Sequence, residues 1–230
     1  MSTRPRLFVP ADLSKDAPVA LDENQSKYLL RVMRLEAGAE VRVFDGRDGE
    51  WLAKIDQILG KASCVLKVES RIREQGTSSD LQLLFAPLKK TRTDFVVEKA
   101  TELGVEVIQP VITQYTQSER VRTDRLVNLA MEAAEQTERL NMPSVLEPVQ
   151  LIRAIETRSK DRRYYYCDER GDDEVAEWGG DENRARPMAD VLRDHGPGPA
   201  AILIGPPSVL MGGTIPMLTQ ALSRYLAEAT

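Results

Sequence analysis

Strand-like and helix-like segments alternate regularly from Leu81 onward. The first apolar run is Leu81 to Ala86, and a helical pattern follows from Thr93 to Leu103, where Gly104 ends it. Parallel strands are joined by crossover helices, and because both faces of such a sheet are buried, its strands read as nearly continuous apolar runs. The alternation therefore predicts an α/β fold in which helices cover both faces of a parallel sheet.

The same alternation continues through the rest of the chain. Further strands are expected at 105–108, 163–167 and 200–204, and further helices at 123–140, 149–157, 188–193 and 215–227. Thr123 is a suitable N-cap for the longest of these helices. Within that helix Leu126, Leu129, Ala130 and Ala133 recur on one face, which is typical of an amphipathic helix.

The first third of the chain has a different hydrophobic period. Glu40 to Phe44 alternates with period two, Asp45-Gly46 offers a turn, and the alternation resumes from Glu50 to Ile58. One helical pattern, Leu29 to Leu35, interrupts the strands, and Asp22 or Asn24 is suited to cap its start. Short strands at this spacing suggest a small β-barrel.

A polar stretch from Arg73 to Asp80 separates the two patterns. Small polar residues and Gly76 make it a linker rather than a strand or a helix. We therefore predict two domains, a β-barrel at 1–75 and an α/β domain at 76–230.

The composition excludes several classes of protein. The mean hydropathy is -0.35, and no run approaches the roughly 18 apolar residues of a membrane helix. The amino terminus lacks the apolar stretch of a signal peptide. Cys64 and Cys167 lie far apart and His195 is the one histidine, so neither a structural zinc site nor a disulfide framework is expected. We expect a cytoplasmic protein with neither a membrane nor a metal partner.

The net charge of -5 is unevenly distributed. The first 75 residues carry 13 Lys and Arg against 12 Asp and Glu, so the acidic excess lies later in the chain. Arg31 and Arg34 are three positions apart and Lys27 is one turn earlier, so with Arg6 they could form a cationic strip. Such a strip would bind phosphates without reading sequence, and ordinary surface charge is the alternative interpretation.

The end of one predicted strand has the character of a binding site. Ala200–Ile204 runs directly into Gly205 and Pro206, and ligands of open parallel sheets bind beyond the carboxyl ends of the strands. An ordinary turn at the end of a strand is the alternative. Neither Gly-x-Gly-x-x-Gly nor a P-loop motif occurs, so the common dinucleotide and triphosphate sites are not expected.

The helix predicted at 123–140 carries a second candidate group. Spacings of three and four place Glu132, Glu135 or Gln136, and Arg139 on one side of the helix. These side chains could act together on a ligand. A solvated helix face with internal ion pairs is the alternative.

Several segments, taken in order, carry a resemblance to a known family. They are Arg6-Leu-Phe8, Tyr28-Leu-Leu-Arg-Val-Met-Arg34 with Gly38, Asp45-Gly46, Lys89, Glu98-Lys-Ala-Thr-Glu-Leu-Gly-Val105 with Pro110, Glu132-Ala-Ala-Glu-Gln-Thr-Glu-Arg139 with Pro143, and Ile202-Leu-Ile-Gly-Pro206. Over roughly residues 6–206 the chain resembles the bacterial 16S ribosomal RNA uracil-N3 methyltransferases, part of the SPOUT superfamily of knotted methyltransferases. The combination of Lys-Ala-Thr-Glu-Leu-Gly-Val with Glu-Gln-Thr-x-Arg is fairly specific.

The resemblance implies a fold and an activity. It implies a PUA-like barrel that binds RNA, followed by a SPOUT-type α/β domain that contains a trefoil knot and binds S-adenosylmethionine. It also implies a homodimer with the active site near the subunit interface, and 16S ribosomal RNA or the small ribosomal subunit as the partner. The expected reaction is S-adenosylmethionine-dependent methylation at N3 of a uridine.

The same resemblance suggests roles for particular residues. The cofactor loop would be lined by Leu203, Ile204, Gly205 and Pro206. Arg139 would hold the base or a phosphate, and Glu135 or Gln136 would orient it. The residues expected to contact RNA are Arg6, Arg31, Arg34, Lys89 and Lys99.

The chain departs from the family at two places. Tyr28 stands where the family usually has histidine, and Pro207-Ser-Val-Leu-Met-Gly-Gly213 replaces the glycine-containing segment that completes the family's cofactor pocket. A shifted reading frame after residue 206 would produce this loss of resemblance. The alternative function is therefore RNA binding by the same fold without methylation. A dinucleotide oxidoreductase is disfavoured, because the glycine fingerprint is missing.

Overall fold

The computed structural model describes residues 4–113, 116, 120–167 and 188–205. The chain divides into two compact units, Met1–Ser78 with Asn128–Met142 and Ser79–Val127 with Pro143–Thr230. The assignment of Asn128–Met142 to the first unit was not apparent from the sequence, in which these residues belong to the strand–helix alternation. The division into domains at 1–75 and 76–230 stays a prediction.

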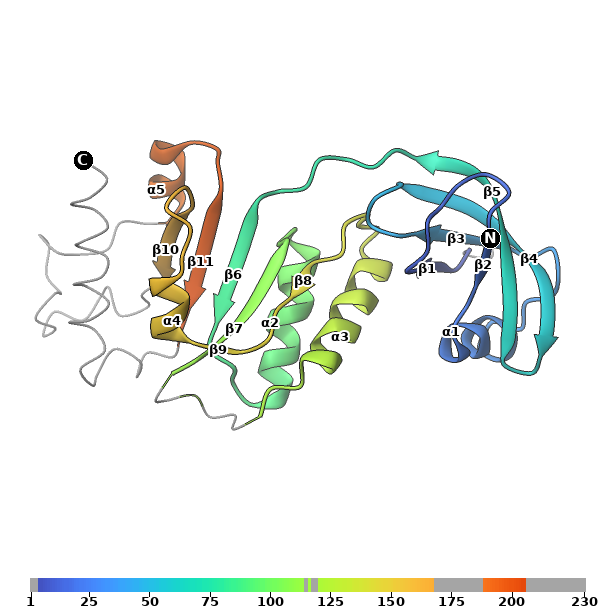
Figure 1. The fold of residues 1–230 in the computed structure, drawn as a ribbon, viewed down its shortest axis with the longest axis horizontal. Helices are drawn as coiled ribbons and strands as arrows, with labels where there is room; N and C mark the ends of the chain where they lie inside the picture. The colour runs from blue at the N-terminus through green and yellow to red at the C-terminus, as the bar shows by residue number, and fades with distance from the viewer. Residues whose placement is uncertain (1–3, 114–115, 117–119, 168–187, 206–230) are drawn as a thin grey trace, which may run out of the picture. The chain divides into compact units, whose positions relative to one another are not determined.

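The first unit is built on a five-stranded sheet with the strand order β1-β3-β4-β5-β2 (Figure 1). Its strands are β1 (Arg6–Phe8), β2 (Pro18–Ala20), β3 (Glu40–Phe44), β4 (Glu50–Gly60) and β5 (Ser63–Arg73). β1 pairs with β3 in parallel, whereas the other neighbours are antiparallel. The predicted strand Glu40–Phe44 is confirmed, and its alternating Val41 and Val43 lie fully buried in the core. Register shifts between β4 and β5 bend this long hairpin.

A short helical segment follows β2, as the sequence predicts. Helix α1 (Glu23–Lys27) begins at Asp22, whose carboxylate accepts a hydrogen bond from the Gln25 amide at 2.8 Å. The helix widens into a π-helical turn, η1 (Tyr28–Val32), and Leu29 of this turn is fully buried in the core of the unit. The helical backbone ends at Arg34, which has a φ of 54°.

The second unit contains a parallel sheet with the strand order β10-β11-β6-β7-β8 (Figure 1). Its strands are β6 (Leu81–Phe85), β7 (Val107–Ile112), β8 (Ser144–Val145), β10 (Arg163–Cys167) and β11 (Ala200–Ile204), and β9 (Val149–Gln150) also pairs with β7. All of these pairs are parallel. The α/β fold with a parallel sheet is therefore confirmed, and the strands predicted at 163–167 and 200–204 have the predicted bounds.

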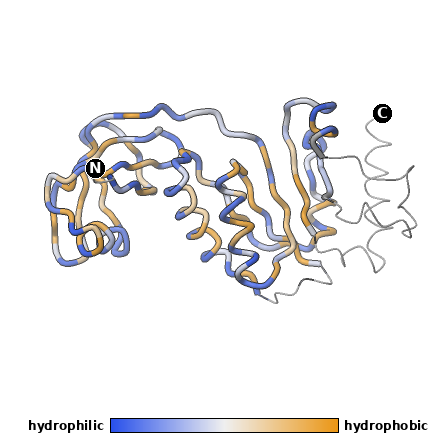
Figure 2. Tube along the Cα trace, turned by 180° about the vertical axis from the view of Figure 1, so that it is seen from behind, coloured by the Kyte–Doolittle hydropathy of each residue, from blue (hydrophilic) through white to orange (hydrophobic). Residues whose placement is uncertain are grey.

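Helices follow the strands of this sheet. They are α2 (Lys90–Glu102), α3 (Thr123–Gln136), α4 (Leu151–Glu156) and α5 (Met188–His195). Leu151 and Ile155 of α4 pack in one cluster with Leu84 of β6 and Leu203 of β11. The neighbours of Leu84 on β6 are buried as well, so both faces of the strand are covered. Figure 2 shows apolar residues concentrated along the strands, whereas the helices alternate between apolar and polar residues.

Several predicted boundaries are wrong. The helix predicted from Thr93 to Leu103 begins three residues earlier, at Lys90, and ends at Glu102. The helix predicted at 123–140 ends at Gln136, because Glu138 takes a left-handed conformation with a φ of 57°. The helix predicted at 149–157 is shorter, because its first two residues form β9. The strand predicted at 105–108 begins at Val107 and continues to Ile112, through a proline. The helix predicted at 215–227, and with it the state of the knot, lies outside the described residues.

Two further observations concern membrane-spanning helices and metal sites, neither of which the sequence predicts. Within the described ranges, every helix is too short or too polar to cross a membrane. Among the same residues, no three His, Cys, Asp or Glu side chains are grouped so that they could hold a metal ion.

Candidate functional site

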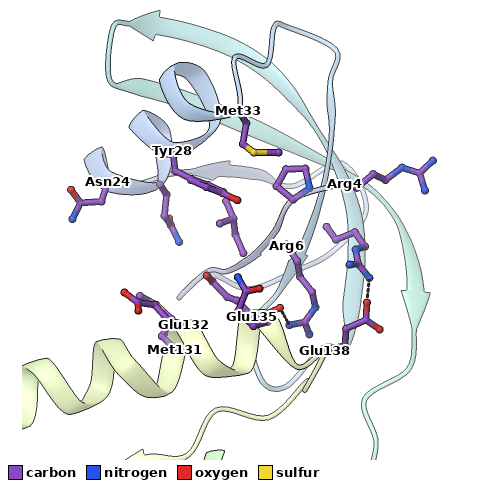
Figure 3. A pocket seen from close by; sticks show the side chains of 14 residues that line it. Arg4, Arg6, Asn24, Tyr28, Met33, Met131, Glu132, Glu135 and Glu138 are labelled. Atoms are coloured by element: carbon purple, nitrogen blue, oxygen red, sulfur yellow. Dashed lines mark hydrogen bonds and ion pairs between the residues drawn. The ribbon is translucent and has the colours of Figure 1, made fainter. Parts of the chain in front are cut away.

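A cavity of about 650 Å³ lies in the first unit, between the α1–η1 segment and the carboxyl-terminal part of α3 (Figure 3). Tyr28 and Met33 border it on the η1 side, and Met131, Glu132 and Glu135 border it on the α3 side. The remaining lining residues are Arg4, Pro5, Arg6, Leu7, Asn24, Gln25, Arg42, Gln136 and Glu138. The cavity thus combines an aromatic ring, two thioethers and several hydrogen-bonding groups, a lining suited to a small planar polar ligand.

A buried ion pair supports the floor of this cavity. The Arg6 Nε atom lies 2.6 Å from the Glu50 Oε1 atom, and the two side chains are 3% and 0% exposed. The guanidinium also stacks 3.8 Å from the centre of the Phe44 ring. Burial of two charges is tolerated because they are paired and because further hydrogen bonds satisfy the guanidinium.

Those further hydrogen bonds are made to carbonyl groups at the carboxyl end of helix α3. Arg6 donates from Nη1 to the carbonyl oxygen of Ala134 at 2.7 Å and from Nη2 to that of Arg139 at 2.5 Å. Carbonyl groups at the end of a helix lack partners within the helix, and a cation there also suits the helix dipole. Arg6 therefore stabilises the fold, and its contact with RNA stays a prediction.

Glu135 is tied to the same strand. Its Oε1 atom accepts a hydrogen bond from the Phe8 amide at 2.9 Å. Burial raises the pKa of the Glu135 carboxyl group, although the Phe8 hydrogen bond and the positive charge of Arg6 act in the opposite direction. Glu135 thus presents a carboxyl group that takes up a proton more readily than an exposed glutamate.

The three predicted catalytic residues are not equivalent in the structure. Glu135 and the exposed Gln136 both line the cavity. Arg139 lies three residues beyond the end of α3, is half-buried and does not belong to the lining. The expectation that Arg139 shares a helix face with Glu135 and Gln136 is therefore wrong, because the helix ends before it.

The predicted cofactor residues lie at the carboxyl end of β11 in the second unit. Leu203 is buried, whereas the side chain of Ile204 is exposed and Gly205 is half-buried. The Ile204 carbonyl oxygen accepts a hydrogen bond at 3.0 Å from the Ala86 amide, just beyond β6. Two strands thus end side by side here, as at the ligand-binding edge of other parallel sheets. Pro206 lies outside the described residues.

The residues predicted to contact RNA differ in their exposure and in whether their charges are already paired. Arg31 and Arg34 are exposed near the end of η1, although Arg31 Nε also donates to the Lys61 carbonyl oxygen at 3.1 Å. Lys89 is exposed at the start of α2. Lys99 pairs with Glu102 at 2.8 Å and with Glu98 at 3.2 Å, so two carboxylates already offset its charge.

Sequence reasoning missed Glu50 and the cavity itself. Glu50 is fully buried and lies within ion-pair distance of Arg6, Arg42 and Arg73. An acidic residue at the start of an apolar alternating strand was the available signal, but its partners come from distant strands. In the sequence Tyr28 stands out only as a departure from the family, because its place in the cavity depends on the packing of η1.

Comparison with known proteins places the chain among RNA methyltransferases. A family model described as an RNA methyltransferase domain matches residues 75–208, and one described as an RNA methyltransferase PUA domain matches residues 21–69. The Ribosomal RNA small subunit methyltransferase E of Rickettsia conorii is 32% identical over 141 residues, which cover 61% of this chain and 57% of that protein. The protein of the same name from Synechocystis is 30% identical over 153 residues, which cover 66% of this chain and 50% of that one. The chain thus matches about half of the length of these relatives.

Solved structures share the fold. The Ribosomal RNA small subunit methyltransferase E of Neisseria gonorrhoeae, bound to S-adenosyl methionine, superposes with a TM-score of 0.71 at 24% identity and covers 89% of this chain and 80% of that one. A probable rRNA-methyltransferase of Porphyromonas gingivalis gives a TM-score of 0.64 at 24% identity, over 90% of this chain and 84% of that one. With the domain model spanning more than half of its residues, the chain belongs to the RNA methyltransferase family.

Proposed function

We propose that this protein transfers the methyl group of S-adenosylmethionine to N3 of a uridine in 16S ribosomal RNA. The observation that carries the proposal is the match of a PUA model and an RNA methyltransferase model in series along one chain. Relatives named as small-subunit methyltransferases support 16S RNA, or the small ribosomal subunit, as the substrate. The uridine N3 position follows from the sequence resemblance described above.

The end of β11 fits the proposed cofactor. The exposed side chain of Ile204 offers apolar surface to an adenosine, and Gly205 lets the backbone come close to a ligand. A relative of the same fold has been solved with S-adenosyl methionine bound. The cofactor would supply an electrophilic methyl group, and Leu203, Ile204, Gly205 and Pro206 would hold it.

The substrate base needs positioning and charge stabilisation. The imide nitrogen of uridine is a weak nucleophile until it loses its proton, and negative charge then spreads to the flanking carbonyl oxygens. We assign Arg139 to hold the base or an adjacent phosphate. The exposed amide of Gln136 is suited to a hydrogen bond with the base, and Glu135 orients the end of α3 through the Phe8 amide.

The proposal includes the setting of the reaction. By resemblance, the protein acts as a homodimer in the cytoplasm, where ribosomal subunits are assembled. A metal ion has no part in the proposed reaction.

A methyl-transfer assay tests the proposed function. Unmodified 16S RNA made by transcription, and small subunits, are incubated with the protein and isotopically labelled S-adenosylmethionine. Digestion to nucleosides followed by mass spectrometry is expected to show label in 3-methyluridine. RNA binding without methyl transfer would instead support the alternative function, and label in another nucleoside would contradict the N3 assignment.

A further inference from the structure

Basic side chains gather around a second cavity, which lies in the second unit where α2 and α3 begin. The cavity has a volume of about 350 Å³. Lys90 reaches it from the first turn of α2, Arg122 and Arg125 reach it from the start of α3, and Arg120 also lines it. The fold thus brings cations from two separate helices to one hollow, which the sequence did not indicate.

The packing of α2 does not explain the cations at its start. Lys89 is the N-cap of α2, Lys90 and Arg92 follow it, and the first turn has no acidic residue. Within the part of the chain that the structure describes, none of these three side chains forms an ion pair. Because the amino-terminal end of a helix carries partial positive charge, cations there are unfavourable unless an anion offsets them. This cluster, together with the cavity beside it, therefore points to an anionic ligand.

The cavity stays positively charged although two carboxylates lie near it. Arg122 pairs with Asp124 at 2.6 Å, and Arg125 pairs with Asp94. Each guanidinium has five N–H donors, so a single carboxylate partner leaves some of them available to a ligand. Lys90 adds a further positive charge, so Lys90, Arg122 and Arg125 together exceed these two carboxylates in charge.

Apart from Thr93, the other lining residues of the cavity are apolar. Pro87, Leu88 and Val121 line it beside the cations. An apolar wall next to a group of guanidinium and ammonium donors suits a ribose attached to a phosphate, since the sugar carbons pack while the phosphate oxygens accept hydrogen bonds.

We propose that this cavity binds a phosphodiester group of the RNA backbone, with Lys90, Arg122 and Arg125 on the phosphate oxygens. The inference rests on the proposed function and adds to it a sequence-independent contact on the second unit. Contacts of this kind set the register and orientation of an RNA on a protein, whereas base contacts set specificity.

The salt dependence of RNA binding tests the site. We compare the wild type with the double variant Lys90→Gln/Arg122→Gln, by fluorescence anisotropy of a labelled single-stranded oligouridylate at several salt concentrations. Arg125 is left in place because its removal would leave Asp94 without its partner. Loss of the contact with this one phosphate is expected to reduce the slope of log affinity against log salt by about 0.7, the value per neutralised phosphate for single strands.

A second double variant, Arg153→Gln/Arg193→Gln, controls for net charge. Both arginines are exposed on other helices, and Arg193 pairs with Asp190 much as Arg122 pairs with Asp124. This control is expected to keep most of the wild-type slope. Equal slopes for the two double variants, or no oligonucleotide binding by the wild type, would overturn the proposed site.

Two further measurements distinguish the proposed RNA site from the proposed function and from a site for small anions. Methyl transfer by the wild type together with an unchanged slope in the Lys90→Gln/Arg122→Gln variant refutes the site and leaves the function standing. A changed slope without methyl transfer supports the site and refutes the function. Inorganic phosphate is added as a competitor at a concentration equal to that of the phosphate groups of the oligonucleotide. Displacement of the oligonucleotide under this condition would contradict recognition of an RNA backbone.

Discussion

At the scale of single residues, burial decides what each charged side chain can do. The guanidinium of Arg6 is enclosed by Glu50, Phe44 and the carbonyl groups at the end of α3, so it acts within the fold. Arg31 and Arg34 are exposed and stay open to a ligand. The same residue type therefore stabilises the protein at one position and is a candidate RNA contact at another.

The buried ion pair leads to a stability prediction. The substitution Glu50→Ala leaves the Arg6 charge buried without its partner, and we expect the free energy of unfolding to fall by about 3–5 kcal/mol. The exposed pair of Arg4 and Glu40 is the control, since Arg4→Ala is expected to cost less than about 1 kcal/mol. Urea unfolding followed by circular dichroism measures both values. A similar small loss in both variants would show that the Arg6–Glu50 pair contributes little.

The raised pKa of Glu135 leads to a pH prediction. Because the folded protein holds the proton of Glu135 more tightly than the unfolded chain does, stability falls as the pH rises from about 4.3, the ordinary glutamate pKa, through the raised value. Glu135→Gln removes this titration and keeps an oxygen for the Phe8 amide. The difference in unfolding free energy between wild type and variant should therefore change across this window. A difference that is flat with pH would contradict the burial argument.

At the scale of elements, left-handed residues mark where two helical segments stop. Glu138 follows α3 with a φ of 57°, and Arg34 follows η1 with a φ of 54°. Such a conformation is common at the carboxyl end of a helix but is unfavourable for a side chain other than glycine. Strain of this kind at an exposed arginine suggests that the side chain is kept for binding rather than for stability.

Substitution of Arg34 separates these two effects. Arg34→Gly is expected to raise the free energy of unfolding by about 1 kcal/mol, because glycine adopts the left-handed conformation at little cost. The same variant should lower the slope of log affinity for single-stranded RNA against log salt by about 0.7. Arg34→Lys keeps both the charge and the strain, so neither quantity should change greatly. Higher stability with an unchanged slope would remove Arg34 from the RNA contacts.

At the scale of the whole molecule, the candidate groups for catalysis and for cofactor binding belong to different compact units. Arg139 belongs to the first unit, and Leu203, Ile204 and Gly205 belong to the second. The proposed reaction needs both, so cofactor binding and methyl transfer should be separable by substitution.

Cofactor binding and methyl transfer are measured on the same variants. S-adenosylmethionine at 100 times its dissociation constant is expected to raise the free energy of unfolding of the wild type by about 2.7 kcal/mol. Arg139→Ala should keep this increase and lose methyl transfer, whereas Ile204→Asp should lose both. Urea unfolding with and without S-adenosylmethionine and the nucleoside assay provide the two readings. Wild-type rates in Arg139→Ala would reject its assigned role.

Much of the second unit could be predicted from local pattern. Strands β10 and β11 lie where the apolar runs place them. Thr123 is the first residue of α3 and not its N-cap, because its hydroxyl donates to the Glu147 carboxylate. The end of α3 was missed, because its stop signal is a left-handed glutamate and a set of carbonyl groups held by Arg6, more than 120 positions away. No local pattern contains such a partner.

The sequence by itself determined the class of fold, the alternation of strands and helices and the family, since each depends on hydrophobic period or on short motifs. Only the tertiary structure decided that β11 lies between β10 and β6, that Arg6 is buried, and that cations from α2 and α3 share one cavity. The physical reason is that strand order, burial and electrostatic environment arise from contacts between distant residues, whereas propensity and period act between neighbours along the chain.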